Sequence, residues 1–187
     1  MAGKTASSSS GERFGPATQD GQWWRLGSAL FLHFGVLHLS MNLWALWDGG
    51  PLVERANGSP RFTAIYVGSG LAGNLLSLVI QGNQDVPGGG SGAIFGIYGA
   101  LLVFLWRERQ SVPAGEFRWL FLATRLFTLI STGLGLFVSG IDNSAHIGGL
   151  ISGILLALLV GWPALMPAAP ATDLQAHFGR ACWPAPS

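Results

Sequence analysis

Two residues in this sequence, Ser91 and His146, have side chains that could carry out nucleophilic catalysis together. Ser91 lies in the stretch GGGSG at residues 88–92. A serine hydroxyl is a weak nucleophile until a base takes its proton, and the reaction also needs N–H donors for the developing oxyanion. The imidazole of His146 exchanges protons near neutral pH, so it suits the role of that base. The sequence therefore suggests a Ser–His pair, provided that the fold brings the two residues together.

Each motif also has a simpler explanation. The glycines around Ser91 could form a flexible link between helices, and His146 could serve only to hydrogen-bond neighbouring helices. The serine motif is not the turn of soluble hydrolases, because no strand precedes it, and it lacks the Gly-Lys-Ser/Thr ending of a phosphate loop. Asp142 could orient the imidazole as in a triad, but Asp is a favoured helix N-cap. We therefore predict a dyad with Asp142 as a cap.

A second polar group, His33, His38 and Asn42, lies in an apolar stretch earlier in the chain. On one helix His38 and Asn42 share a face, whereas His33 would point about 140° away from His38. This spacing argues against a helical zinc site. Asn42, and secondly His38, could donate hydrogen bonds to an oxyanion, although hydrogen bonding between helices would also explain them. Phe95, four residues after Ser91, shares its face and could stack on the His146 imidazole or simply pack.

The elements that must position these residues are predicted to be membrane helices. Hydrophobic residues make up 49% of the 187 residues and charged residues only 10%, against about 25% charged in a soluble domain. A membrane helix needs about 20 mostly apolar residues. Five segments qualify, and they predict an all-α, polytopic membrane helix bundle. These segments are residues 28–47, 62–80, 91–106, 117–138 and 143–162.

Small residues and loop charges predict how these helices are arranged. Gly92 and Gly96 in the third segment, and Gly149 and Gly153 in the fifth, are spaced four apart, which lets two membrane helices touch closely. The loops after the first and third segments carry Arg, whereas those after the second and fourth carry neither Lys nor Arg. The Arg-bearing loops are therefore predicted to be cytoplasmic, and the candidate residues of three helices meet in the outer half of the bundle.

The remaining sequence limits the domain and its partners. Residues 1–20 are predicted to be a disordered polar tail, residues 21–162 the membrane domain, and residues 163–187 an Ala/Pro-rich tail. The net charge is +1 and the basic residues are scattered, so no nucleic-acid partner is expected. The single cysteine, Cys182, excludes an internal disulfide and a Cys-based metal cage.

The ordered set of motifs resembles the rhomboid family of intramembrane serine proteases. The resemblance covers about residues 21–161 and rests on four motifs in family order. These motifs are Trp24-Arg25, His33-x4-His38-x3-Asn42, Gly89-Gly90-Ser91-Gly92 and Ala145-His146-x-Gly148-Gly149. The family usually has six core helices, the first of them before the Trp-Arg loop. Here a polar tail occupies that place, so we expect five.

The resemblance implies a function and a role for each site residue. Ser91 and His146 would form the catalytic dyad of an endopeptidase, with His38 and Asn42 lining the oxyanion hole near Gly90, and Phe95 packed on the histidine. It implies transmembrane protein substrates in a lipid bilayer, no metal and no cofactor, and a multi-pass protein that we assign to a bacterial plasma membrane.

Two other functions compete with this hypothesis. A catalytically inactive or truncated rhomboid-like protein could bind membrane clients without cleaving them. A transporter could use the intramembrane His and Asn residues as a path for protons or solutes, but such proteins often contain internal repeats, and the sequence has none.

Overall fold

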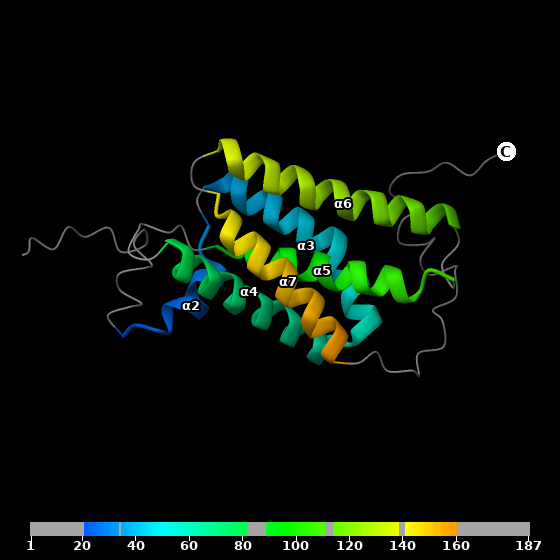
Figure 1. The fold of residues 1–187 in the computed structure, drawn as a ribbon, viewed down its shortest axis with the longest axis horizontal. Helices are drawn as coiled ribbons and strands as arrows, with labels where there is room; N and C mark the ends of the chain where they lie inside the picture. The colour runs from blue at the N-terminus through cyan, green and yellow to red at the C-terminus, as the bar shows by residue number, and fades with distance from the viewer. Residues whose placement is uncertain (1–20, 34, 82–88, 111–113, 139–140, 161–187) are drawn as a thin grey trace, which may run out of the picture.

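The computed structural model describes residues 21–33, 35–81, 89–110, 114–138 and 141–160, which form a helix bundle with no strand in these ranges (Figure 1). This confirms the predicted all-α fold. The predicted tails, 1–20 and 163–187, lie outside the described residues. The elements are α2 (Arg25–Ser28), the 3₁₀ helix η1 (Ala29–Phe31), α3 (Val36–Asn57), α4 (Ser59–Gln81), α5 (Ser91–Arg107), α6 (Ala114–Phe137) and α7 (Asn143–Leu159).

The last four predicted segments agree with α4 to α7, and each end is predicted to within three residues. The first segment, predicted as one helix over 28–47, is wrong. The short helices α2 and η1 end at Phe31, and α3 begins at Val36 at an angle of 89° to them. Gly35 has φ +92°, a conformation that glycine adopts easily and that does not occur within a helix. The apolar stretch is therefore broken at this glycine, and α3 continues instead to Asn57.

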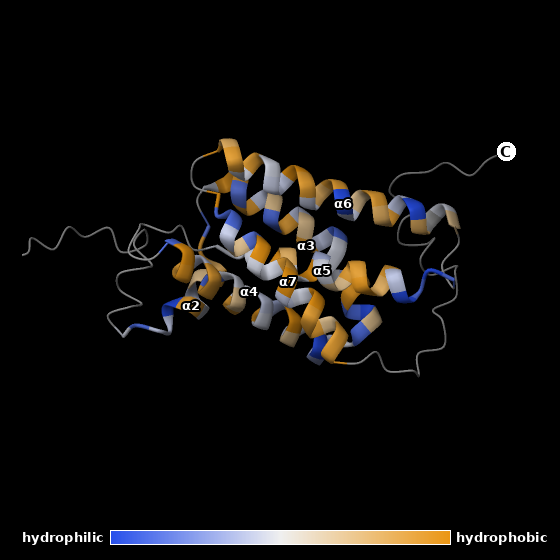
Figure 2. Cartoon of the chain, in the orientation of Figure 1, coloured by the Kyte–Doolittle hydropathy of each residue, from blue (hydrophilic) through white to orange (hydrophobic). Residues whose placement is uncertain are grey.

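The lengths of the helices bear on how the bundle fits a bilayer. By length and composition, α4 and the part of α6 from Phe117 to Phe137 could each cross a membrane, and the bent unit of α2, η1 and α3 could be a third crossing. Helices α5 and α7 are apolar but have 17 residues each, which is the lower limit for a span. Figure 2 shows apolar residues along the length of the helices, and many large apolar side chains are exposed on them, such as Trp44, Val79, Leu129 and Leu159, as expected where lipid is the solvent.

Helix α5 forms the centre of the bundle, with α4 and α7 packed closely against it (Figure 1). All ten residues from 92 to 101 are buried. A side chain at Gly149 would overlap the carbonyl group of Gly92, and one at Gly153 would overlap the backbone of Gly96. Close contact between the third and fifth segments was predicted from these two glycine pairs, and it is confirmed. Backbone contact therefore fixes how α5 and α7 lie relative to each other.

Helix α6 lies at the edge of the bundle (Figure 1), where it contacts α5 and α7. In its apolar window 11% of the residues are buried, against 39% for α4. Leu120 and Thr124 face inward, while Trp119, Leu129 and Phe137 are exposed. This helix therefore packs through a narrow stripe and presents most of its surface outward.

Candidate active site

Ser91 is the first residue of α5, and Gly90 is its N-cap. No side chain caps this helix, so the N–H groups of its first turn point outward from the helix end without a side-chain acceptor. A side chain at Gly90 would meet the carbonyl oxygen of Leu30 at 2.6 Å. Glycine is thus required where η1 packs against the start of α5. The local structure presents the Ser91 hydroxyl beside a helix N-terminus, where positive potential favours a developing negative charge.

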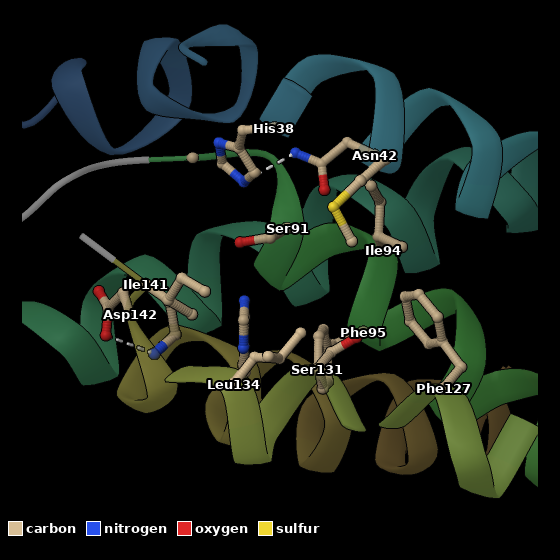
Figure 3. A pocket seen from close by; sticks show the side chains of 14 residues that line it. His38, Asn42, Ser91, Ile94, Phe95, Phe127, Ser131, Leu134, Ile141 and Asp142 are labelled. Atoms are coloured by element: carbon tan, nitrogen blue, oxygen red, sulfur yellow. Dashed lines mark hydrogen bonds between the residues drawn. The ribbon is translucent and has the colours of Figure 1, made fainter. Parts of the chain in front are cut away.

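His38 and Asn42 lie one turn apart on α3 and are joined by a hydrogen bond of 3.1 Å between Asn42 Nδ2 and His38 Nε2. Figure 3 shows both side chains on the α3 side of the Ser91 hydroxyl. A side-chain carbon placed at Gly89 would be 3.6 Å from His38 Cε1 and 3.8 Å from Ser91 Oγ. Gly89 thus lies beside both His38 and Ser91, and the role of His38 and Asn42 as oxyanion donors stays a prediction.

His33 does not lie where the sequence analysis expected it. The 140° estimate assumed one continuous helix, but His33 precedes α3, and the break at Gly35 turns its ring toward His38. The two ring centroids are 5.7 Å apart, and His33 Nε2 is 3.7 Å from the position of a side-chain carbon at Gly90. His33 thus adjoins the site, and Gly35 was the signal in the sequence that could have indicated it.

His146 is buried in the first turns of α7 and stacks on Phe95 of α5. The ring centroids are 4.0 Å apart, and the planes are inclined by 9°. The stacking suggested by the position of Phe95 is therefore present. Phe127 of α6 lies 5.9 Å from Phe95, on a second side of that ring. These contacts fix the plane of the imidazole, because rotation would require both aromatic rings to move.

Asp142 is the N-cap of α7, as predicted, and its Oδ1 accepts a hydrogen bond of 3.0 Å from the Ala145 amide. The same carboxylate accepts hydrogen bonds from Ser77 and, at 2.8 Å, from Gln81 Nε2, both on α4. Neither Ser77 nor Gln81 was predicted from the sequence to contact α7. They hold α4 to the first turn of α7, one turn before His146, and Asp142 is committed to these groups rather than to the imidazole.

One cavity of about 90 Å³ joins these groups. Ser91, His146, His38, Asn42 and Phe95 all line it, with Gly89, Asp142 and residues of α6 including Phe127, Ser131 and Leu134. Gly90 adjoins it as the N-cap of α5. The volume is enough for several water molecules, since one needs roughly 10–15 Å³. In Figure 3 the Ser91 hydroxyl points into the space between the labelled residues of α3 and α6. The arrangement brings together a serine hydroxyl, an imidazole, a carboxamide and room for water.

Comparisons with known proteins give one consistent family. The family model described as Rhomboid domain matches residues 20–163. Rhomboid protease GluP of Bacillus subtilis (strain 168) is 42% identical over 148 residues, covering 76% of this chain and 27% of that protein.

Two further relatives extend the range of organisms and lengths. RHOMBOID-like protein 9, chloroplastic, of Arabidopsis thaliana is 36% identical over 138 residues, covering 72% of this chain and 30% of that protein. Putative rhomboid protease YdcA of Bacillus subtilis (strain 168) is 34% identical over 140 residues, covering 75% of this chain and 68% of that protein. This chain thus spans less than a third of the length of the first two relatives and about two thirds of the third.

Proposed function

Because this chain belongs to the rhomboid family, whose proteases are intramembrane serine proteases, we propose that it is an endopeptidase that uses Ser91 and His146 as a dyad. One observation carries the proposal. Residues from three helices that are distant in sequence, Ser91 on α5, His146 on α7 and the His38–Asn42 pair on α3, line a single cavity. Each motif alone has a structural explanation, but their meeting at one cavity with the chemistry of acyl transfer favours catalysis.

In the proposed reaction, Ser91 Oγ attacks the scissile carbonyl carbon while the imidazole of His146 takes the hydroxyl proton. The carbonyl oxygen becomes an oxyanion, which accepts hydrogen bonds from the amides at the start of α5 and from the Asn42 side chain, with His38 beside it. His146 then gives the proton to the amine nitrogen as the scissile C–N bond breaks, so the amine leaves, the carbonyl re-forms and an acyl-serine ester remains. Water from the cavity attacks that ester with His146 again as base, which releases the new carboxyl end and restores Ser91.

The proposal assigns no catalytic role to Asp142. Its oxygens accept hydrogen bonds from Ala145, Ser77 and Gln81, so it acts as a cap and a link between α4 and α7. The pair Ser91–His146 is thus proposed as a dyad, with Phe95 holding the ring plane by stacking.

The protein is an integral membrane helix bundle, and this narrows the proposed substrates and location. We propose that its substrates are transmembrane proteins, because the cavity lies among helices that expose many large apolar side chains, as lipid requires. The domain proposed at residues 21–162 is supported by the family match over 20–163. We assign it to a bacterial plasma membrane, supported by the Bacillus subtilis relative at 42% identity, although relatives also occur in plants and fungi.

A fluorophosphonate probe tests the proposal, because it forms a covalent bond only with an activated serine. The purified protein in detergent should be labelled, and Ser91→Ala and His146→Ala should each lose labelling. Ser131→Ala is the matched control, since Ser131 lines the same cavity from α6, and it should keep labelling. An unlabelled wild-type protein would contradict the dyad and favour the alternative of a non-catalytic rhomboid-like protein that binds membrane clients.

A further inference from the structure

Two buried polar atoms in the first turn of α7 lack a hydrogen-bond partner among the described residues, Asn143 Oδ1 and His146 Nδ1. A buried polar atom without a hydrogen bond costs free energy, so nearly all such atoms in folded proteins have a partner. The two atoms are chemically complementary. An amide oxygen accepts hydrogen bonds, and a neutral imidazole that accepts a proton at Nε2 carries its hydrogen at Nδ1.

The positions of the two residues bring these atoms to one side of the helix. Asn143 and His146 are three apart on α7, a spacing that puts side chains on the same face. The Asp142 cap fixes the conformation of this turn through its bond to Ala145. The link between α4 and Asp142 then holds the turn in place within the bundle. Asn143 is therefore presented to His146 by a rigid first turn.

Helix α6 shapes the space that the Asn143 side chain occupies. A side-chain carbon at Gly135 would overlap Asn143 Oδ1, and it would lie 2.7 Å from Asn143 Cγ. Leu134, the neighbour of Gly135, lines the same cavity as His146. The absence of a side chain at Gly135 thus lets the Asn143 carboxamide lie between α7 and α6.

We propose that Asn143 is a positioning residue for the reaction, and that its side-chain oxygen holds the Nδ1–H group of His146. Neither atom is bonded to the other in the structure, so the link forms through a small shift of the Asn143 side chain or through one water molecule, and either form selects the tautomer whose Nε2 is free to take the serine proton. This inference rests on the proposed dyad. It gives the imidazole a neutral orienting group in place of the carboxylate of a triad, since Asp142 is already used by the α7 cap.

The test compares four variants by their rates of fluorophosphonate labelling. Asn143→Leu removes the acceptor at similar volume, and Gly135→Ala displaces the carboxamide without changing the sequence of α7. Both should lower the labelling rate about three- to tenfold, the worth of one neutral hydrogen bond. Asn143→Asp keeps an acceptor oxygen and should label within about twofold of the wild type. Gly133→Ala is the control on α6, because nothing lies within 4 Å of a side-chain carbon there.

A second readout separates positioning from loss of stability. In ¹⁵N-histidine-labelled protein, with His146→Ala to assign the signals, the ring nitrogens of His146 should report a hydrogen-bonded Nδ1–H. This signature should be lost in Asn143→Leu and Gly135→Ala and kept in Asn143→Asp and Gly133→Ala. If Asn143→Leu does not fold, the comparison of Gly135→Ala with Gly133→Ala carries the test.

The outcomes distinguish this inference from the proposed function. A labelled wild-type protein whose rate and ring signals do not change in Asn143→Leu or Gly135→Ala would overturn the role of Asn143 and leave the dyad standing. An unlabelled wild-type protein would overturn the dyad, and the ring signals would then still report whether Asn143 holds the imidazole.

Discussion

The contact between α5 and α7 and the packing of α6 differ in how much room they leave. At Gly149 and Gly153 of α7, a single added carbon would overlap the backbone of α5. At Gly133 of α6, an added carbon would meet nothing within 4 Å. Both regions are apolar and rich in small residues, so composition alone does not separate them. What separates them is whether a glycine faces another backbone or open space.

This difference has a consequence for the site. Ser91 and His146 are carried by the two helices that touch through their backbones, so their relative position is set by contacts with no side chain to adjust. One wall of the cavity comes from α6, through Phe127, Ser131 and Leu134, on a helix that buries little of its surface. The positions of Ser91 and His146 therefore depend on the tight contact between α5 and α7. The shape of the cavity depends also on α6, which is packed more loosely.

The largest effect should come from filling the tight contact away from the site. Gly153 lies two turns beyond His146, and a side chain there would overlap the carbonyl oxygen of Gly96. Since the obstacle is backbone, Gly153→Leu should lower the free energy of unfolding by more than about 3 kcal/mol, the upper range for overpacking. Circular dichroism during titration with a denaturing detergent measures this.

Leu155→Ala is the control for that variant, because Leu155 is exposed on the same helix and should change stability by less than about 0.5 kcal/mol. If Gly153→Leu unfolded at the same detergent fraction as Leu155→Ala, the backbone contact would not be what holds α5 to α7.

A smaller loss is expected from the polar link between α4 and α7. Asp142→Ala removes the cap of α7 and the acceptor for Ser77 and Gln81. Loss of a cap costs about 0.5–2 kcal/mol, and unpaired buried donors add to it, so a total of about 2–4 kcal/mol is expected in the same titration. Asp142→Asn keeps one oxygen as acceptor and should lose less. If the wild type, Asp142→Ala and Asp142→Asn were equally stable, apolar packing alone would hold α7 in the bundle.

Contacts that follow from spacing within one helix could be predicted from the sequence, whereas contacts between distant segments could not. The spacing of Gly149 and Gly153 predicted a close helix contact, and the position of Phe95 suggested its stacking on His146. Both follow from helical periodicity. The link from Ser77 and Gln81 to Asp142 was missed because it joins residues more than 60 positions apart, and each looks like an ordinary polar residue in its own segment.

The break before α3 was missed for a different reason. Eight of the eleven residues from 29 to 39 are apolar, the others being His33, Gly35 and His38. Hydropathy therefore predicted one helix. The conformation of Gly35 decides otherwise, and hydropathy does not report it. His33 was consequently assigned to the wrong direction, although its neighbours His38 and Asn42 share a helix face as predicted.

An intermediate effect is expected at Tyr98, where α5 contacts both α3 and the loosely packed α6. The Tyr98 hydroxyl of α5 shares its one hydrogen between two acceptors on α3, Asp48 Oδ2 and the Ala45 carbonyl, each at 3.3 Å. Its ring stacks on Phe127 of α6, with the ring centroids 4.2 Å apart. Tyr98→Phe keeps the stacking and loses the hydroxyl. It should lower the free energy of unfolding by about 0.5–1.5 kcal/mol, whereas Tyr98→Leu should lose more. A Tyr98→Phe protein as stable as the wild type would mean that α3 is held by apolar packing alone.

The smallest effect, and the one of opposite sign, is expected in the loosely packed helix α6. Gly133 lies inside α6, where glycine costs about 0.5–1 kcal/mol relative to alanine, and an added methyl group meets nothing within 4 Å. Gly133→Ala should therefore raise the free energy of unfolding by up to that amount. Gly149→Ala adds the same methyl group on α7 and should instead destabilise, because it overlaps the Gly92 carbonyl. Since both variants gain the same helix propensity, their difference in unfolding free energy measures the backbone contact itself. If Gly133→Ala destabilised the protein as much as Gly149→Ala, α6 would be as closely packed as α7, and the contrast between the two regions would fail.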